Sequence, residues 1–104
     1  MKTGIDLIAD ERKRQIEKEG WTAEHDANHT DDTLALAGVC YAIPSYLRKY
    51  EKEVPFFWPW DKESWKPTPD NRIKELVKAG ALIAAEIDKL QEELEHINKK
   101  RHEE

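Results

Sequence analysis

Apolar residues recur in alternating steps of three and four along the last third of the chain. These positions are Ile73, Leu76, Gly80, Ile83, Ile87, Leu90, Leu94 and Ile97. Such spacing predicts a long helix with a heptad-like seam, beginning near Pro69 and Asp70. From Gln91 the seam continues with little other apolar surface. Residues 91–104 are therefore either a charged helical extension that meets a partner or a solvated tail.

A second helical pattern, near the N-terminus, has polar residues where its core-facing stripe should be apolar. It predicts a helix over about Ile5–Glu19, with Thr3 as N-cap and Asp6 in a loose capping box. Its stripe consists of Ile5, Ile8, Arg12, Gln15 and Ile16. Gly20 suits the position that ends the helix, and Trp21 would then pack back on its last turn.

A third pattern predicts a helix between a cluster of acids and a proline. Thr30 or Asp31 is a good N-cap, and Pro44 ends or kinks the helix. Two stripes run along it, made of Leu34, Gly38 and Tyr41 and of Ala37 and Cys40. Because several of these residues are small, another helix is expected to approach closely.

The segment before the last predicted helix, residues 53–69, has no regular periodicity. It holds four of the five prolines and three of the four tryptophans. A loop this long in a small domain usually has a function or packs as a lid. The alternative is a cover over a thin core, made by Phe56, Phe57, Trp58 and Trp60. The patterns together predict one all-α domain, 1–104, with three main helices, a long aromatic loop and an extended C-terminal helix.

The composition excludes several classes of protein. Charged and hydrophobic residues each make up 38% of the chain, and the net charge of −5 opposes general nucleic-acid binding, which needs a basic face. The single cysteine, Cys40, excludes an internal disulfide, and no apolar run approaches the ~20 residues of a membrane span. The start of the chain lacks the apolar core of a signal peptide. We therefore expect a cytoplasmic protein with no membrane span, and the sequence indicates no cofactor.

Residues 20–32, GWTAEHDANHTDD, combine two histidines with acids and a tryptophan. His25 and His29 are spaced to share one face of a helix, where a third ligand such as Asp26 would complete a zinc site. The glutamate of a metalloprotease motif is missing between them, and the stretch adjoins a predicted helix cap, where such residues are common. We expect no metal here and predict a polar turn whose acids and histidines are held by Arg12.

Signatures of catalysis are sparse. All-α nucleoside triphosphate pyrophosphohydrolases hold magnesium through E-x-x-E and E-x-x-D pairs. The only E-x-x-E here is Glu92 with Glu95, on the charged tail, and E-x-x-D does not occur. A magnesium site would instead need acids that converge in space, such as Glu11, Asp26, Asp32 and Glu86. There is no P-loop or nucleophile elbow, and Cys40 lies among apolar residues, where a buried thiol is expected.

Arginine, histidine and tryptophan together favour recognition of a nucleotide. A guanidinium suits phosphate, a tryptophan face suits a base, and Arg72 opens the last helix, whose N-terminal end favours anions. For Arg12, the alternative is an ion pair with Asp26 or Asp32. The candidate ligand-binding residues are Arg12, Trp21, His25, Asp26, His29, Trp58, Trp60 and Arg72.

Three motifs, in order along the chain to about Leu90, resemble a family of small proteins from tailed phages and prophages. They are ERKRQIEKEGWTAEHDANHT, WPWDKESWKP and RIKELVKAGALIAAEIDKL. The resemblance implies a phage protein acting in the bacterial cytoplasm, and no particular activity. The order Gly20, Trp21, Asp26, His29 and Leu34 is also similar to the RyR repeat domain, from which the aromatic loop departs. RyR-like modules are suspected to bind nucleotide ligands, which agrees with the argument from the residues.

The favoured hypothesis is therefore a phage accessory protein that binds a small nucleotide-like ligand and sequesters a host defence signal. One alternative is a magnesium-dependent nucleoside triphosphate pyrophosphohydrolase. Another is an inhibitor that binds a host protein through exposed aromatic residues. We also expect a homo-oligomer, a dimer built on the seam Ile83–Ile97 of the C-terminal helix.

Overall fold

Three α-helices form the frame of the protein in a computed structural model, which describes residues 1–19, 32–48 and 54–103. They are α1 (Gly4–Glu19), α3 (Thr33–Ala42) and α4 (Arg72–Glu103). Two short 3-10 turns, η1 (Ser45–Leu47) and η2 (Lys62–Ser64), lie between α3 and α4. Within these residues the structure contains helices and no strands, which confirms the predicted all-α class.

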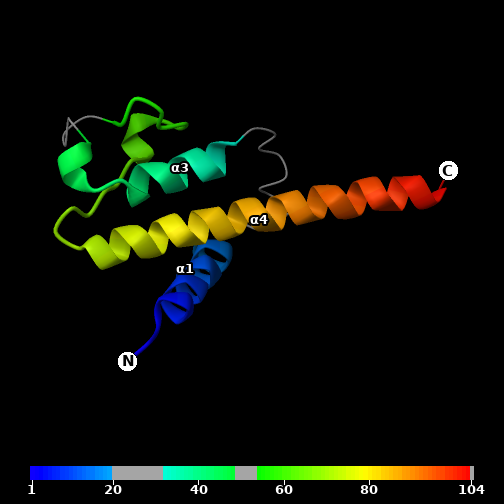
Figure 1. The fold of residues 1–104 in the computed structure, drawn as a ribbon, viewed down its shortest axis with the longest axis horizontal. Helices are drawn as coiled ribbons and strands as arrows, with labels where there is room; N and C mark the ends of the chain where they lie inside the picture. Colours follow the sequence, from blue (N-terminus) through cyan, green and yellow to red (C-terminus); the bar gives the residue numbers. More distant parts are fainter. Residues whose placement is uncertain (20–31, 49–53, 104) are drawn as a thin grey trace.

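Helix α4 is the spine of the fold, and its 32 residues span about 48 Å. Both α1 and α3 pack on its first half, on different sides, and its second half extends beyond them (Figure 1). The approach of α1 depends on Gly80, because a Cβ atom there would lie 2.5 Å from Cδ1 of Ile8. No helix in the described residues is long and apolar enough to cross a membrane.

Local capping chemistry sets where α1 and α4 begin. The backbone N–H of Asp6 donates to Oγ1 of Thr3 at 3.2 Å, and the Thr3 N–H donates to Oδ2 of Asp6 at 3.1 Å. This reciprocal pair is the predicted capping box. At α4, Oδ1 of Asn71 accepts from the N–H of Lys74 at 3.1 Å. The helix therefore begins at Arg72, two residues later than the sequence pattern indicates.

Helix α3 is shorter than the pattern predicts. It begins at Thr33, and Asp32 occupies the N-cap position without a side-chain hydrogen bond to the helix. The expected caps Thr30 and Asp31 lie outside the described residues. The helix ends before Pro44, as expected. Both predicted stripes are buried: Leu34, Ala37, Gly38, Cys40 and Tyr41.

Helix α1 contributes mainly polar groups to the interior. Its buried residues are Arg12 and Gln15, which confirms that polar side chains occupy its core-facing stripe. Ile5 and Ile16 were expected on the same stripe, but their exposed fractions are 81% and 38%. Helix α1 crosses α4 at a steep angle (Figure 1), so that only part of the stripe faces α4.

The core is small and joins α3, α4 and the segment of residues 54–69, here called the aromatic segment. Its buried members are Leu34, Ala37, Cys40, Tyr41, Trp58, Ala79, Leu82 and Ala85, with Val54, Phe57, Trp60 and Trp65 packed against them. The aromatic segment therefore covers the core, which is the structural alternative that the sequence left open. Phe56 does not take part, because its side chain is fully exposed.

The heptad-like seam of α4 lies at the edge of the packed face, where it touches α1 at Gly80 and α3 at Ile83. The buried residues of α4 are Glu75, Ala79, Ala81, Leu82, Ala85, Glu86 and Lys89. Its seam residues from Ile73 to Ile97, apart from Gly80, are each at least 43% exposed. Small alanines allow α3 to lie close to α4, while the large apolar side chains of the seam face outward.

Candidate functional site: an aromatic and cationic cleft

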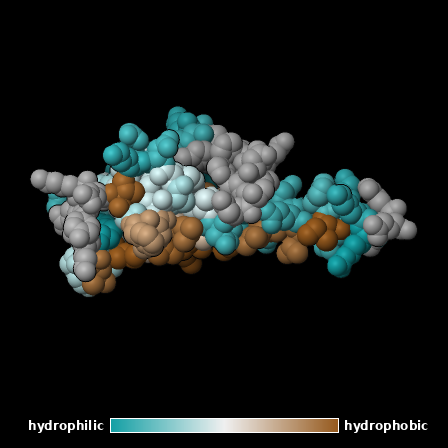
Figure 2. Space-filling model, turned by 90° about the horizontal axis from the view of Figure 1, so that it is seen from above, coloured by the Kyte–Doolittle hydropathy of each residue, from teal (hydrophilic) through white to brown (hydrophobic). Residues whose placement is uncertain are grey.

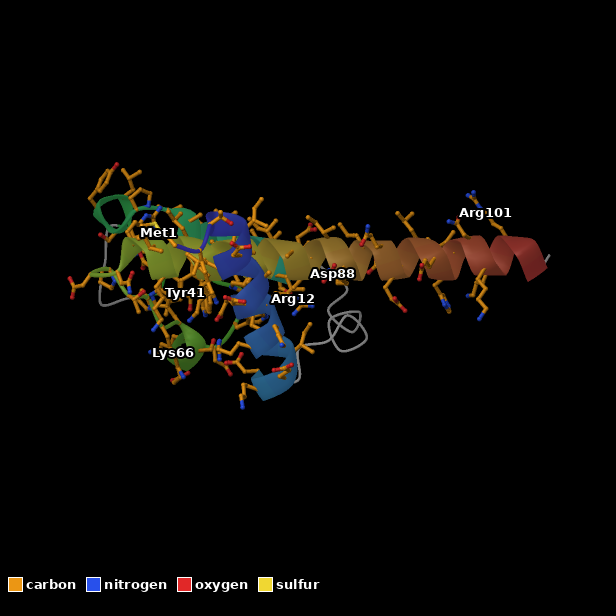
Figure 3. The ribbon with its side chains drawn as sticks, turned by 90° about the horizontal axis from the view of Figure 1, so that it is seen from below. Met1, Arg12, Tyr41, Lys66, Asp88 and Arg101 are labelled. Carbon is orange, nitrogen blue, oxygen red and sulfur yellow. The ribbon has the colours of Figure 1, made fainter. Side chains whose placement is uncertain are left out.

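A cleft of about 330 Å³ lies between the C-terminal half of α1, the aromatic segment and α4. Its lining residues are Arg14, Gln15, Glu19, Tyr41, Trp58, Trp60, Ser64, Lys66, Lys78 and Leu82. Figure 3 shows Tyr41 and Lys66 together on one side of α4, next to α1. This volume falls at the lower end of the range for small-molecule sites.

Aromatic rings form one wall of the cleft. The ring of Trp58 lies edge-on to Tyr41 at 5.6 Å and to Trp60 at 5.4 Å between centroids. Two backbone contacts fix this arrangement. Nε1 of Trp58 donates to the carbonyl oxygen of Asp61 at 3.1 Å, and the N–H of Lys66 donates to the Tyr41 hydroxyl at 3.1 Å. The wall is therefore pre-formed, and it offers ring faces and edges to a ligand.

The Tyr41 hydroxyl stays neutral in this setting. Burial raises the pKa of Tyr41, although the hydrogen bond from the Lys66 N–H acts in the opposite direction. A neutral phenol brings no negative charge into the cleft, so the nearby cations are not offset by it.

Three cations line the cleft, from three different parts of the fold: Arg14, Lys66 and Lys78. The Lys78 ammonium lies over the Tyr41 ring, 4.9 Å from its centroid. Burial lowers the pKa of Lys78, and the charges of Glu11 and Glu19 only partly oppose this. A desolvated ammonium gains from a nearby anion, so a negatively charged ligand would be attracted to Lys78.

The guanidinium of Arg14 is held in place by carboxylates. It donates to both oxygens of Glu11, at 2.7 and 2.9 Å, and to Glu19 at 3.1 Å. The hydrogen bond to Glu11 raises the pKa of Arg14. Burial alone would raise the pKa of Glu11, but the hydrogen bonds and charge of Arg14 lower it overall. Arg14 is thus held in place and stays charged at neutral pH, with Glu11 and Glu19 offsetting its charge at this edge of the cleft.

Gln15 places a buried amide at the cleft. It is 1% exposed, and its Nε2 donates to Oε2 of Glu11 at 3.4 Å. Its Oε1 atom is buried and has no hydrogen-bond partner in the described part of the chain. Buried acceptors are nearly always paired in folded proteins, so this oxygen favours a donor at the base of the cleft.

A buried ionic cluster, here called the Glu75 clasp, supports the aromatic wall from behind. The carboxylate of Glu75 accepts from Nη2 of Arg48 at 2.8 Å, from the N–H of Thr68 at 3.2 Å and from Nη1 of Arg72 at 3.4 Å. Arg48 also lies 5.4 Å from the ring centroid of Trp65. The clasp therefore joins the segment after α3, the aromatic segment and the start of α4.

Arg72, predicted to bind a ligand at the start of the last helix, makes hydrogen bonds within the fold. Its guanidinium donates to the carbonyl oxygens of Tyr41, Ala42 and Ile43 at the end of α3. These carbonyls would otherwise lack partners at a helix C-terminus. Arg72 belongs to the Glu75 clasp and does not line the cleft.

The other predicted site residues fall into two groups. Trp58 and Trp60 line the cleft. Arg12 is buried against α4, where its Nε lies 3.4 Å from Oδ2 of Asp88, and it does not line the cleft. Four more predicted ligand-binding residues lie outside the described residues: Trp21, His25, Asp26 and His29. The expected turn held by Arg12 lies there too.

The acids that were considered for a magnesium site do not gather in the described parts of the chain. Glu11 is bound to Arg14, and Glu86 pairs with Nζ of Lys89 at 3.1 Å. Residues 1–19, 32–48 and 54–101 contain no group of three or more His, Cys, Asp or Glu side chains placed to hold a metal ion.

Sequence reasoning missed the cations of the cleft. Lys78 carries a signal that could have been used, because it is the only charge in the stretch from Leu76 to Ala85, which is otherwise small or apolar. Arg14 adjoins the predicted Arg12 in the ERKRQ motif but faces another side of α1. Lys66 has no local signature.

Comparison with family models, curated proteins and solved structures finds no significant match to this chain.

Proposed function

We propose that the chain binds a small anionic ligand with a planar ring, of the nucleotide class, in the cleft between α1, the aromatic segment and α4. The observation that carries the proposal is the meeting of an aromatic wall with three cations in one cleft. Ring faces stack on bases, and lysine and arginine bind phosphate. Binding, rather than turnover, is the simplest use of this arrangement.

The resemblance to small phage proteins adds a setting for this activity. A phage accessory protein that binds a nucleotide would remove that molecule from the host, and sequestration of a nucleotide signal of host defence is the role we favour. Such a role needs a tight site and no catalytic group. The cleft suits this role because neighbouring residues already hold its cations in position.

The direct test is a thermal-shift screen of mono- and dinucleotides, including cyclic ones, with and without Mg²⁺, followed by calorimetric titration. We expect Trp60→Ala and Lys78→Met to weaken binding at least tenfold. Lys74→Met is the matched control, because Lys74 is exposed and lies one turn earlier on α4. The proposal is wrong if no nucleotide stabilises the parent at millimolar concentration, or if the cleft variants bind as the parent does.

The same screen separates binding from the enzymatic alternative. Stabilisation without product supports a binding protein. Release of pyrophosphate or phosphate only in the presence of Mg²⁺ would favour the pyrophosphohydrolase hypothesis, with acids supplied in part by residues outside those described.

A different observation favours binding of a host protein as a second function. Phe56 is fully exposed, and Tyr46 and Leu47 of η1 are 81% and 62% exposed. Exposed aromatic side chains are common anchors of protein interfaces. If this function exists, replacing Phe56 and Tyr46 by serine should abolish capture of a purified host factor while leaving nucleotide binding unchanged.

A further inference from the structure

A continuous band of large apolar side chains remains uncovered on the side of α4 between α1 and α3. We call it the apolar stripe. Its members are Ile73, Leu76, Ile83, Ile87, Leu90, Leu94 and Ile97 of α4, with Val39 of α3; each is between 43% and 67% exposed. Figure 2 shows brown, hydrophobic atoms along one edge of the molecule, from the body toward the tail.

Contacts between α3 and α4 make the stripe continuous across the two helices. A Cβ atom on Gly38 would lie 3.1 Å from Cγ1 of Ile83, so the two helices touch at that point. Val39 follows Gly38 directly, about 100° further around α3, and so flanks this contact. The stripe therefore gains one α3 side chain beside Ile83 and is one seam wide along the tail.

From these contacts we infer that a second copy of this chain binds along the apolar stripe and pairs the two α4 helices. The spacing is the first argument. Steps of three and four residues suit knobs-into-holes packing against another helix with the same spacing, and a second α4 provides one. Every seam position of α4 from Ile73 to Ile97 is apolar or glycine. Pairing two such seams therefore places no charge at the centre of the contact.

The amount of exposed surface is the second argument. With about 180 Å² for each fully exposed side chain, the stripe offers roughly 700 Å², which is close to the ~800 Å² that one partner buries in a standard-size interface. A monomer of this size with so small a core gains little other burial. Among the described residues, no other helix lies beside the tail beyond Gln91 (Figure 1), which leaves Leu94 and Ile97 available to a partner.

The pairing leaves the cleft open. Lys78, which lines the cleft, is about 180° around the helix axis from Ile87 of the stripe. A pair of chains would therefore present two clefts facing away from the contact. This self-association goes beyond the proposed ligand binding and does not depend on it.

Light scattering coupled to size exclusion tests the inference at about 50 µM chain. We expect the parent at a multiple of its 12.2 kDa chain mass, a dimer in the simplest case. The double variant Leu90→Glu with Leu94→Glu should elute as a monomer. Because both side chains are exposed and outside the core, the body should still melt cooperatively by circular dichroism.

The matched control places two glutamates on another face of the same tail, as His96→Glu with Lys99→Glu. It should remain associated. Val39→Glu, on the α3 part of the stripe, should weaken association at least tenfold. A parent that is monomeric at 100 µM, or a double variant with the parent's mass, overturns the inference. A monomeric parent would indicate a different macromolecule on the stripe.

Discussion

Replacing Glu75 by glutamine is expected to destabilise the protein severely, although glutamine has nearly the same shape. Glu75 is 1% exposed, and its carboxylate accepts from Arg48, Arg72 and the N–H of Thr68. The side chain of Arg48 is itself only 7% exposed. Glutamine offers one acceptor oxygen and places an NH₂ group against these donors. The substitution therefore leaves a buried guanidinium without a counter-charge.

The size of the effect follows from that unpaired charge. Breaking a buried ion pair by removing one partner costs about 3–5 kcal/mol. A domain of this size has about 5–15 kcal/mol of folding free energy in total. At about 4–8 °C of melting temperature per kcal/mol, Glu75→Gln should melt at least ~12 °C below the parent.

Thermal and urea melts followed by circular dichroism measure this loss. Glu63→Gln, on the exposed turn η2, is the matched control and should change the free energy of unfolding by less than about 0.5 kcal/mol. The double variant Arg48→Met with Glu75→Leu should lose less stability than the sum of its single changes, because it removes both charges. A Glu75→Gln protein that melts within about 2 °C of the parent would refute the role assigned to the clasp.

Three further predictions concern other buried groups. Arg12→Ala should cost about 1–3 kcal/mol in urea melts, because it removes a buried stem and the partner of Asp88; an unchanged melt would show that these contacts of Arg12 add no net stability. Lys78→Met should melt above the parent at pH 7, because the folded pKa of Lys78 lies below its unfolded value of 10.5. The stability of the parent therefore rises with pH between these two pKa values, and the difference in melting temperature between variant and parent should narrow toward pH 10.5. A constant gap would contradict this. Burial raises the pKa of Cys40 to about 11, so its thiol should react with a disulfide reagent at pH 8 far more slowly in the folded protein than in urea; equal rates would contradict the buried position.

Local chemistry explains which parts of the fold could be predicted from the sequence. The Thr3 and Asp6 capping box lies within four residues, so the start of α1 could be predicted to within one residue. The periodicity of α4 identified a long helix and its apolar seam. It did not show whether that seam faces the core or the outside. The direction of the seam depends on alanines at other positions of α4, which let α3 approach beside it.

The candidate site was only partly predictable, because most of it forms between distant segments. Trp58 and Trp60 stood out through the unusual density of tryptophan and proline around them. Lys78 and Tyr41 are 37 positions apart, and their contact depends on how α3 crosses α4. The Glu75 clasp joins Arg48 to a glutamate 27 residues later, which no local motif encodes. Arg72 has the expected charge at a helix start, but its guanidinium donates to carbonyl groups at the end of α3, a contact that no local pattern predicts.

The most direct test of the proposed binding site is a nitrogen-proton correlation spectrum of labelled parent protein, titrated with the nucleotide that gives the largest thermal shift. We predict that the indole signal of Trp60 and the backbone amides of Lys66 and Lys78 shift together, saturating at one ligand per chain. The amides of the α4 tail beyond Gln91 should not move. Shifts confined to the tail or to the Glu75 clasp, or none at saturating ligand, would contradict the account of the cleft.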